Sequence, residues 1–178
     1  MSSITSRRSI RKYTGEWVTD EQVAELLRAA MSAPSAANQQ PWRFVVIRSQ
    51  DLLDLIPTFH PHASMAPNAS VVIAVCADLR ELSIPDRWVQ DCSAATENLL
   101  LAAHEMGLGA VWLGVYPTEE RVEGVRNLLG LPDYVMPLSM VSIGHPAEQP
   151  PVVDRFHASY VHHDRWGQEA AGGPGRPA

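Results

Sequence analysis

The sequence predicts a single globular domain in which helices cover a sheet that has a fully buried central strand. The chain has 178 residues, of which 46% are hydrophobic and 19% charged, and this suits one domain with a sizeable core. Apolar residues recur at helical spacing after Thr19 and again between Pro85 and Met106. The run from Val71 to Ala77 is continuously apolar and rich in β-branched residues, which is typical of a strand covered on both faces.

The first predicted helix begins at Thr19, whose hydroxyl stands three residues before Gln22 in a capping-box pattern. Apolar positions on one helical face follow as far as Met31. The helix must end before Pro34, because a proline disfavours helical geometry in the residue that precedes it. The segment from Pro34 to Pro41 is predicted to be a loop, since two prolines bracket small and amide residues.

The remaining elements follow from the same reasoning. They are a strand at Phe44–Ile47, a short helix from Ser49 ending near Pro57, the central strand at Val71–Ala77, a helix at Pro85–Met106, a strand at Ala110–Val115, a helix capped by Thr118, and a strand at Val135–Ile143. Gly107 and Gly130 are predicted to end the two later helices. The longest helix would span roughly 30 Å and is predicted to be the spine of the domain or of a dimer interface.

The C-terminal region carries no helical or strand period. The run from Arg155 to Trp166 is polar and aromatic, and it is predicted to be an arm laid over a surface. We expect one domain over residues 1–166 and a disordered tail over 167–178, because the tail is of low complexity.

Composition excludes several classes of protein. Fourteen Lys and Arg against twenty Asp and Glu give a net charge of −6, which argues against a nucleic-acid partner. Cys76 and Cys92 lie in apolar runs and are predicted to be buried thiols in a reducing compartment. No apolar run approaches the roughly 20 residues that cross a bilayer, and MSSITSRRS has no signal-peptide centre. We therefore expect a cytoplasmic protein with no membrane partner.

Few side chains form a recognisable catalytic pattern. The histidines have no carboxylate at a metal-ligand spacing, so no metal site is predicted. No nucleophile motif or catalytic carboxylate pair is evident, and Asp91 and Glu97 are expected to make local hydrogen bonds or to face solvent. Two classes remain open: a binding protein, or an enzyme whose bound cofactor performs the reaction.

Two segments could hold a ligand. Arg7, Arg8, Arg11 and Lys12 surround Ser9 in an otherwise acidic chain. Guanidinium groups and a hydroxyl suit phosphate oxygens, although a solvated basic N-terminus explains the same pattern. The amides of the loop from Pro34 to Gln40 can both donate and accept, as a flat heterocycle with mixed edges requires. A plain connecting loop is the alternative.

Four segments together resemble the FMN-dependent nitroreductase family. They are SRRSIRKY at Ser6–Tyr13, APSAANQQPW at Ala33–Trp42, the stretch from Gln90-Asp91 through Asn98–His104 to Gly107–Gly114, and IGHP at Ile143–Pro146. The resemblance extends from Thr5 to about Trp166 in the family's order. It implies an α+β fold: a three-layer sandwich with a mainly antiparallel central sheet flanked by helices, built as a homodimer that exchanges its C-terminal arms.

The resemblance also implies a set of FMN-binding residues. Carried over by motif, they are Arg7, Arg8, Ser9 and Arg11 from one subunit, Pro34, Ser35, Ala36 and Asn38 from the other, the backbone of Leu113 and Gly114 near the flavin N5, and Arg155 in the arm. Arg7 and Ser9 would hold the phosphate and ribityl end, and Arg11 would lie towards the pyrimidine edge. A cation there stabilises the reduced flavin. No side chain is predicted to be a catalytic acid or base.

The sequence departs from the family pattern at three places. Position 36 is alanine where many relatives carry a hydroxyl, and Met65 stands nearest to a flavin-contacting lysine of some larger members. The segment from Ala77 to Asp86 is a brief loop where longer members insert helices over the active site, so an open pocket is expected.

The function implied by the resemblance is ping-pong transfer of two electrons from NADH or NADPH, through the FMN N5, to a nitroaromatic, a quinone or a similar conjugated acceptor. An FMN-dependent dehydrogenase or oxidase of a specific metabolite is the second interpretation. A flavin-binding protein without turnover is the third.

Overall fold

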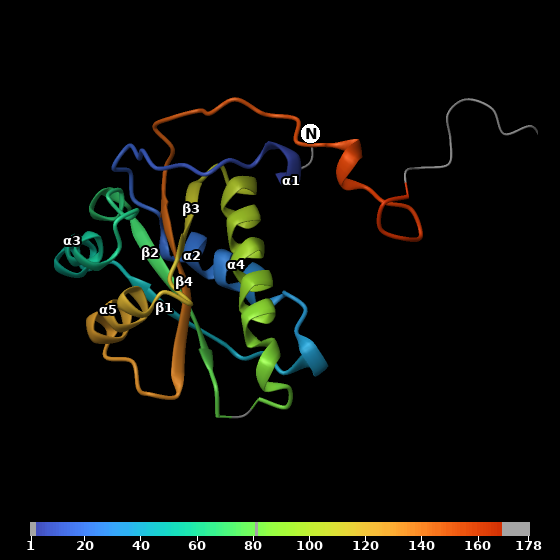
Figure 1. Cartoon of the computed structure of the whole chain (residues 1–178). Coiled ribbons are helices and arrows are strands. Elements are labelled where there is room, and N and C mark those ends of the chain that lie inside the picture. The colour runs from blue at the N-terminus through green and yellow to red at the C-terminus, as the bar shows by residue number, and fades with distance from the viewer. Residues whose placement is uncertain (1–2, 81, 169–178) are drawn as a thin grey trace, which may run out of the picture.

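A computed structural model describes residues 3–80 and 82–168 of the chain (Figure 1). Its centre is a four-stranded sheet with the strand order β1-β2-β4-β3. The strands are β1 (Trp42–Ile47), β2 (Val71–Asp78), β3 (Gly109–Gly114) and β4 (Val135–Gly144), and all three strand pairs are antiparallel. The prediction that the run beginning at Val71 is a central strand is confirmed, since β2 lies between β1 and β4.

Four helices cover the two faces of this sheet (Figure 1). On one face, α2 (Asp20–Met31) and α4 (Trp88–Glu105) pack against Ile73 and Val75 of β2. On the other face, α3 (Gln50–Phe59) and α5 (Glu119–Leu129) pack against Val72 and Ala74. Side chains alternate between the faces of a strand, so one continuous apolar run supplies both cores. The predicted three-layer α+β sandwich is confirmed.

The N-terminal segment runs along the open edge of β3 after the short helix α1 (Ser3–Ser6). The Ile10 amide donates to the Ala110 carbonyl over 3.0 Å. Two paired glycines, Gly109 and Gly144, allow the close approach: a Cβ on the first would lie 2.5 Å from Ile10, and one on the second would lie 2.8 Å from Tyr13. The lack of these side chains brings the basic N-terminal segment onto the sheet.

Local signals define most helix ends as predicted. Thr19 and Gln22 form the expected capping box at the start of α2. Gly107 and Gly130 adopt positive φ angles of 72° and 63° just beyond α4 and α5, a conformation that glycine reaches without a steric penalty. Thr118 is at the N-cap of α5, but its side chain makes no capping hydrogen bond.

Two helix boundaries differ from the prediction. Pro57 lies inside α3, which continues to Phe59. A proline removes only one N–H from the helical ladder, and the buried side chains of Leu53 and Ile56 anchor this helix to the sheet. The long helix α4 begins at Trp88 because Pro85–Arg87 forms a 3₁₀ turn before it.

The C-terminal arm, described here over residues 151–168, leaves the body of the domain after β4. Residues 151–161 are all exposed, and the arm extends beside the domain instead of packing on it (Figure 1). Of the predicted tail over 167–178, residues 169–178 lie outside the described part of the chain.

Cys76 and Cys92 are buried free thiols, as expected. None of the described helices is both long and apolar enough to cross a membrane.

Candidate functional site

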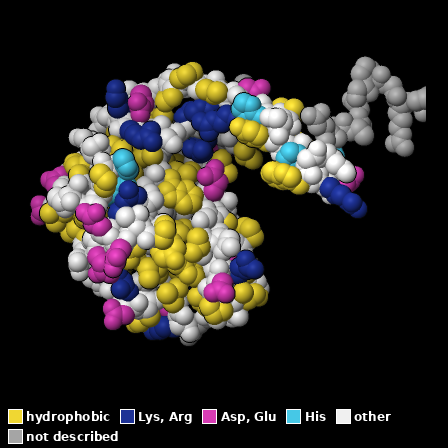
Figure 2. Space-filling model, in the orientation of Figure 1, with side chains coloured by type: hydrophobic (Ala, Val, Ile, Leu, Met, Phe, Trp, Pro, Cys, Tyr) yellow, Lys and Arg dark blue, Asp and Glu magenta, His cyan; other side chains and the backbone are white. Residues whose placement is uncertain are grey.

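Three arginines meet where the arm leaves the body. Arg7, Arg8 and Arg155 line one cavity of about 510 Å³, together with residues of α1 and of the arm. Figure 2 shows Lys and Arg side chains gathered on this part of the surface. The structure thus brings Arg155 to the N-terminal arginines across more than 140 positions of sequence.

These arginines are held differently. The Arg8 guanidinium donates to the carbonyls of Pro151 (2.9 Å from Nε) and Thr5 (3.0 Å from Nη1), so it ties the arm to the N-terminal segment. The Arg7 Nε lies 3.5 Å from Glu97 Oε1. It is buried without a hydrogen-bond partner among the described residues. Arg7 is therefore held by an ion pair with Glu97, in contrast to Arg8, which is held by backbone carbonyls.

Ser9 and Arg11 lie along a trough made of two adjoining cavities. One, of about 510 Å³, is lined by Ser9, Arg11, Lys12, Ser64, Met65, Asn68, Glu148 and Pro150. The other, of about 420 Å³, shares Arg11, Ser64 and Met65 with it and continues along β3 to Gly114. The Glu148 carboxylate holds the N-terminal segment beside this cavity, because it accepts from the backbone amides of Arg11 (2.5 Å) and Lys12 (3.1 Å).

The free edge of β3 forms one wall of this trough. Because the Ala110 carbonyl accepts from Ile10, and because residues of an antiparallel strand alternate between the two edges, Trp112 and Gly114 also direct their backbone groups outward. Leu113, paired with Met140, directs its own towards β4. Of the two predicted backbone sites, Gly114 is thus the one that faces the cavity, and a Cβ there would meet nothing within 4 Å.

His60 and Arg121 hold the Gly114 carbonyl. His60 Nε2 lies 2.9 Å from this oxygen, and Arg121 Nη1 lies 3.0 Å from it. A carbonyl only accepts, so Nε2 carries the proton. Burial, with Arg121 nearby, lowers the pKa of His60, which keeps the ring neutral. No sequence motif marks these two residues, because only the fold brings them beside β3.

The loop after α2 lies on the other side of α4 from β3 (Figure 1). It contains Pro34, Ser35, Ala36 and Asn38, and its Ala36–Asn38 segment is a 3₁₀ turn. Four of the predicted FMN ligands are therefore separated from Arg11 and Gly114 within one chain.

Asp91 corrects an expectation from the sequence. Its side chain is buried and bonds to this loop, 55 positions away, instead of bonding locally or facing solvent. Asp91 follows Trp88 by three positions and precedes Cys92 on the apolar side of the predicted helix. A carboxylate on the apolar side of a helix needs a buried hydrogen-bond partner, and this position could have indicated the role of Asp91 from the sequence. Glu97, by contrast, is half-exposed and pairs with Arg7.

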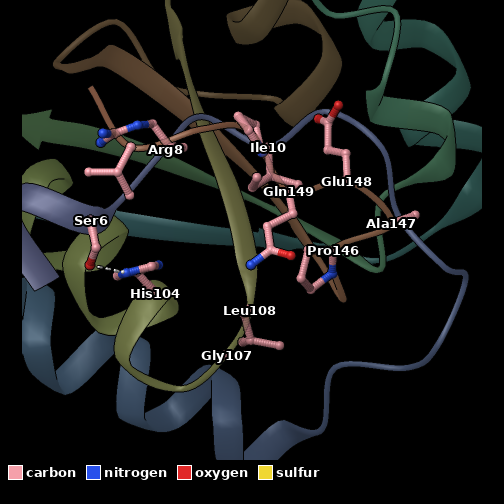
Figure 3. Close-up of a pocket in the computed structure, with 12 residues that line it drawn as sticks. Ser6, Arg8, Ile10, His104, Gly107, Leu108, Pro146, Ala147, Glu148 and Gln149 are labelled. Atoms are coloured by element: carbon pink, nitrogen blue, oxygen red, sulfur yellow. Dashed lines mark hydrogen bonds between the residues drawn. The ribbon is translucent and has the colours of Figure 1, made fainter. Parts of the chain in front are cut away.

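Another cavity, of about 690 Å³, is lined by the segment 146–150 that follows β4 (Figure 3). Ser6 Oγ and His104 Nε2 are 2.7 Å apart on one side of it, and Glu148 and Gln149 line the other (Figure 3). Among the predicted site residues, Arg8 lines it, and its guanidinium donates to backbone carbonyls. The trough from Ser9 to Gly114, not this cavity, collects the predicted ligands.

Known proteins resemble the chain over most of its length. The model of the Nitroreductase family matches residues 4–69 and 60–145. A protein of Methanothermobacter thermautotrophicus, provisionally named NADH dehydrogenase/NAD(P)H nitroreductase, is 48% identical over 93% of this chain and 87% of its own. The crystal structure of a provisionally assigned NADH oxidase from Clostridium acetobutylicum is 40% identical, with a TM-score of 0.90 over 93% of this chain and 100% of its own.

A third match was crystallised with a flavin. It is a provisionally assigned nitroreductase from Desulfovibrio desulfuricans in complex with FMN, 35% identical, with a TM-score of 0.79 over 92% of this chain and 95% of its own. With the family model matching well over half of the sequence and the fold agreeing, the chain belongs to the Nitroreductase family.

Proposed function

We propose that this protein is an FMN-dependent oxidoreductase that transfers two electrons from NADH or NADPH to a nitroaromatic, a quinone or a similar conjugated acceptor. The observation that carries the proposal is the trough from Ser9 to Gly114, in which a basic segment meets the free edge of β3. Family membership and the FMN complex of a relative support the same cofactor.

The residues fit the phosphate end of FMN. Arg7 and Arg155 line the same cavity, and Glu97 fixes the Arg7 guanidinium there by an ion pair. Arginine forks are suited to phosphate because they give paired, permanently charged donors. Arg8 contributes by fixing the arm through Pro151, because its donors are occupied by carbonyls.

The residues also fit the ring end. Arg11 borders both cavities, and its cation favours a ligand that gains negative charge on reduction. The outward-facing N–H of Gly114 offers a donor at the sheet edge, and His60 and Arg121 fix the orientation of that peptide. Met65 gives an apolar contact where some relatives have a lysine, so Arg11 supplies the positive charge.

A homodimer completes the site in this proposal. The loop with Pro34, Ser35, Ala36 and Asn38 lies across α4 from the trough (Figure 1), so it serves the flavin of the other subunit. The exposed arm supports the same assembly, because it needs a surface that its own chain does not provide.

The protein contributes binding and electrostatics to the reaction. When bound, FMN would supply the two-electron redox chemistry that links the nicotinamide to the acceptor in a ping-pong sequence, and Arg11 and Gly114 would hold its ring. The chain orients the ring through Gly114, stabilises negative charge through Arg11, and leaves the trough open to solvent, which supplies protons. No side chain is required as a proton donor.

The absorbance spectrum of the purified protein tests this function. We expect flavin bands that bleach on anaerobic addition of NADPH or NADH, and steady-state nicotinamide oxidation with a quinone. Flavin bands that persist with both nicotinamides would instead support a metabolite dehydrogenase or oxidase, or a flavin carrier. The proposal would be contradicted if the purified protein held no flavin and if the absorbance spectrum of added FMN did not change in its presence.

Replacing Arg11 with alanine tests the ring assignment. We expect the variant to bind FMN about tenfold more weakly, or to lower its reduction potential by roughly 30 mV, because one charge-assisted interaction is lost. Arg28→Ala is the control, since Arg28 is an exposed cation of α2 that pairs with Glu25. Equal affinity and equal potential in Arg11→Ala and the wild type would remove Arg11 from the site.

A further inference from the structure

The loop that carries Asn38 has an unfavourable backbone. Ala37, Asn38 and Gln40 have φ angles of 49°, 55° and 46°, a left-handed region that side chains with a Cβ rarely adopt. Three such residues within four positions do not persist unless surrounding contacts hold them. Hydrogen bonds within the loop, such as that from the Gln40 amide to Ser35 Oγ over 3.1 Å, are joined here by contacts from outside it.

Asp91 provides the first contact. Its Oδ1 accepts from the Ala36 amide over 2.9 Å, and its Oδ2 accepts from Gln39 Nε2 over 2.7 Å. A carboxylate in the first turn of a helix is favourable in itself, but both oxygens of this one are directed at the loop. Asp91 is only 5% exposed, and the two hydrogen bonds that it accepts from the loop are partly buried.

Gln39 extends the network to the segment before α4. Its Oε1 accepts from the Ile84 amide (3.0 Å) and the Ser83 hydroxyl (3.4 Å), while Nε2 also donates to the Ile84 carbonyl (3.2 Å). The Ile84 amide can only donate, so it fixes which end of the Gln39 amide faces Asp91. Donors and acceptors are thus matched along the whole chain of bonds from Ile84 to Asp91.

We propose that Asp91 and Gln39 are positioning residues that hold the loop in the strained conformation that presents Asn38 to the flavin of the other subunit. The inference rests on the proposed function. Asn38 is exposed and its Oδ1 lies 3.4 Å from Gln40 Nε2, so it remains accessible to a ligand. Neither positioning residue touches the flavin; each acts through the backbone of residues 36–40.

The matched bond between Asp91 and Gln39 allows a sharp test. Asp91→Asn leaves one side-chain acceptor for two donors, the Ala36 amide and Gln39 Nε2. Gln39→Glu places a carboxylate against both Asp91 and the Ile84 carbonyl. The double variant D91N/Q39E restores a donor facing an acceptor between positions 91 and 39, with the negative charge moved to position 39 and the Ile84 carbonyl left without the Gln39 donor. Glu105→Gln is the control, because it removes an exposed carboxylate from the same helix.

The readouts are FMN affinity, from fluorescence titration of the apoprotein, and the visible circular dichroism of bound FMN. We expect each single variant to bind FMN about tenfold more weakly, as is typical when a buried hydrogen bond is mismatched. We expect the double variant to bind FMN more tightly than the sum of the two single losses would give, since coupled residues are not additive, although the lost bond to the Ile84 carbonyl prevents full recovery. Glu105→Gln should match the wild type.

A second cycle separates positioning from general stability. In an Asn38→Ala background, Asp91→Asn should weaken FMN binding less than it does in the wild type, because only the contacts of Pro34, Ser35 and Ala36 remain to be misplaced, even though it lowers the thermal midpoint as before. If Asp91→Asn fails to fold, Gln39→Leu breaks the same bond from the loop side.

Three results would overturn the inference: unchanged affinity in both single variants, additive losses in D91N/Q39E, or an undiminished effect of Asp91→Asn without Asn38. The wild-type titration distinguishes these from failure of the proposed function. A wild-type protein that binds no FMN overturns both, whereas one that binds FMN leaves these three results to judge Asp91 and Gln39 alone.

Discussion

The strand β2 and the C-terminal arm are both rich in apolar side chains, yet their environments are opposite. All eight residues of β2, Val71–Asp78, are buried between the two helical layers. In the arm, Val152, Phe156 and Trp166 are 53%, 73% and 90% exposed. Burial of such side chains is the main favourable contribution to folding, and the arm does not obtain it within its own chain.

The hydrogen bonds of the two regions differ in the same way. β2 is bonded on both sides, to β1 and to β4. The arm is tied to the body near its start, where Arg8 donates to Pro151. Further out, its backbone hydrogen bonds among the described residues are local, such as that from the Tyr160 amide to the His157 carbonyl. An apolar segment with a fixed origin and a free outer part is suited to cover a second copy of the chain.

Removing the arm should give the largest effect on assembly. A chain that ends at Val153 keeps the Arg8 contact but loses Arg155, Phe156, Tyr160 and Trp166. If two large side chains are buried on the partner, the dimer dissociation constant should rise about 100-fold or more, at about 1.5–3 kcal/mol each. Analytical ultracentrifugation measures this, with removal of residues 169–178 alone as the control. An unchanged dimer would show that the arm lies outside the interface.

A mutation that creates a cavity in the core of the domain should lower the free energy of unfolding strongly. Leu99 of α4 is fully buried against the sheet, so Leu99→Ala should lower the free energy of unfolding by about 2–5 kcal/mol. Chemical denaturation at fixed protein concentration measures it. Leu101→Ala, at a half-buried position of the same helix, should cost less. Equal losses would mean that the core is not centred where the structure places it.

Shortening single exposed side chains should show whether the arm, rather than another part of the surface, contributes to the dimer interface. Phe156→Ala should weaken the dimer about tenfold, because an aromatic side chain buried at an interface is worth about 1.5 kcal/mol or more. Leu55→Ala, at a 48% exposed position of α3, should leave the dimer constant unchanged. Dilution series by light scattering compare the two variants. The reverse order would assign the interface to the α3 face.

The smallest expected effect is a pH dependence in the body. Because burial lowers the pKa of His60, below about pH 6.5 the unfolded chain takes up a proton that the folded chain resists. Stability should therefore fall as the pH drops from 6.5 towards the folded pKa, and should be independent of this group above 6.5. His60→Gln, whose amide can still donate to Gly114, should lack this part of the slope in parallel unfolding experiments at pH 7 and 5. Identical slopes would show that His60 does not carry it.

Local sequence signals predicted the elements well where nearby residues decide them. The capping box of Thr19 and Gln22 defines the start of α2, and Gly107 and Gly130 lie just beyond the helices that they end. The prediction was wrong at Pro57, because tertiary packing of Leu53 and Ile56 outweighs the local preference of a proline. The free thiols and the central strand followed from composition alone, since both depend on apolar character.

The candidate site was predictable as a list of residues but not as an arrangement. Motifs identified Ser9, Arg11 and Gly114, and the structure brings them to one trough. Periodicity could not distinguish the backbone direction of Leu113 from that of Gly114, which the pairing of β3 with β4 decides. It also placed Asp91 in a local role, although its partners are Ala36 and Gln39.

By itself, the sequence determined the helices and their ends, the doubly covered strand, and the family. These depend on neighbours within one or two turns, or on the order of motifs along the chain. The tertiary structure alone decided that α4 stands between the Asn38 loop and the trough, that His60 and Arg121 hold the Gly114 peptide, and that the arm lies exposed. These contacts join different elements, in the case of His60 and Gly114 across 54 positions, and their geometry exists only once the sheet and its helices have packed.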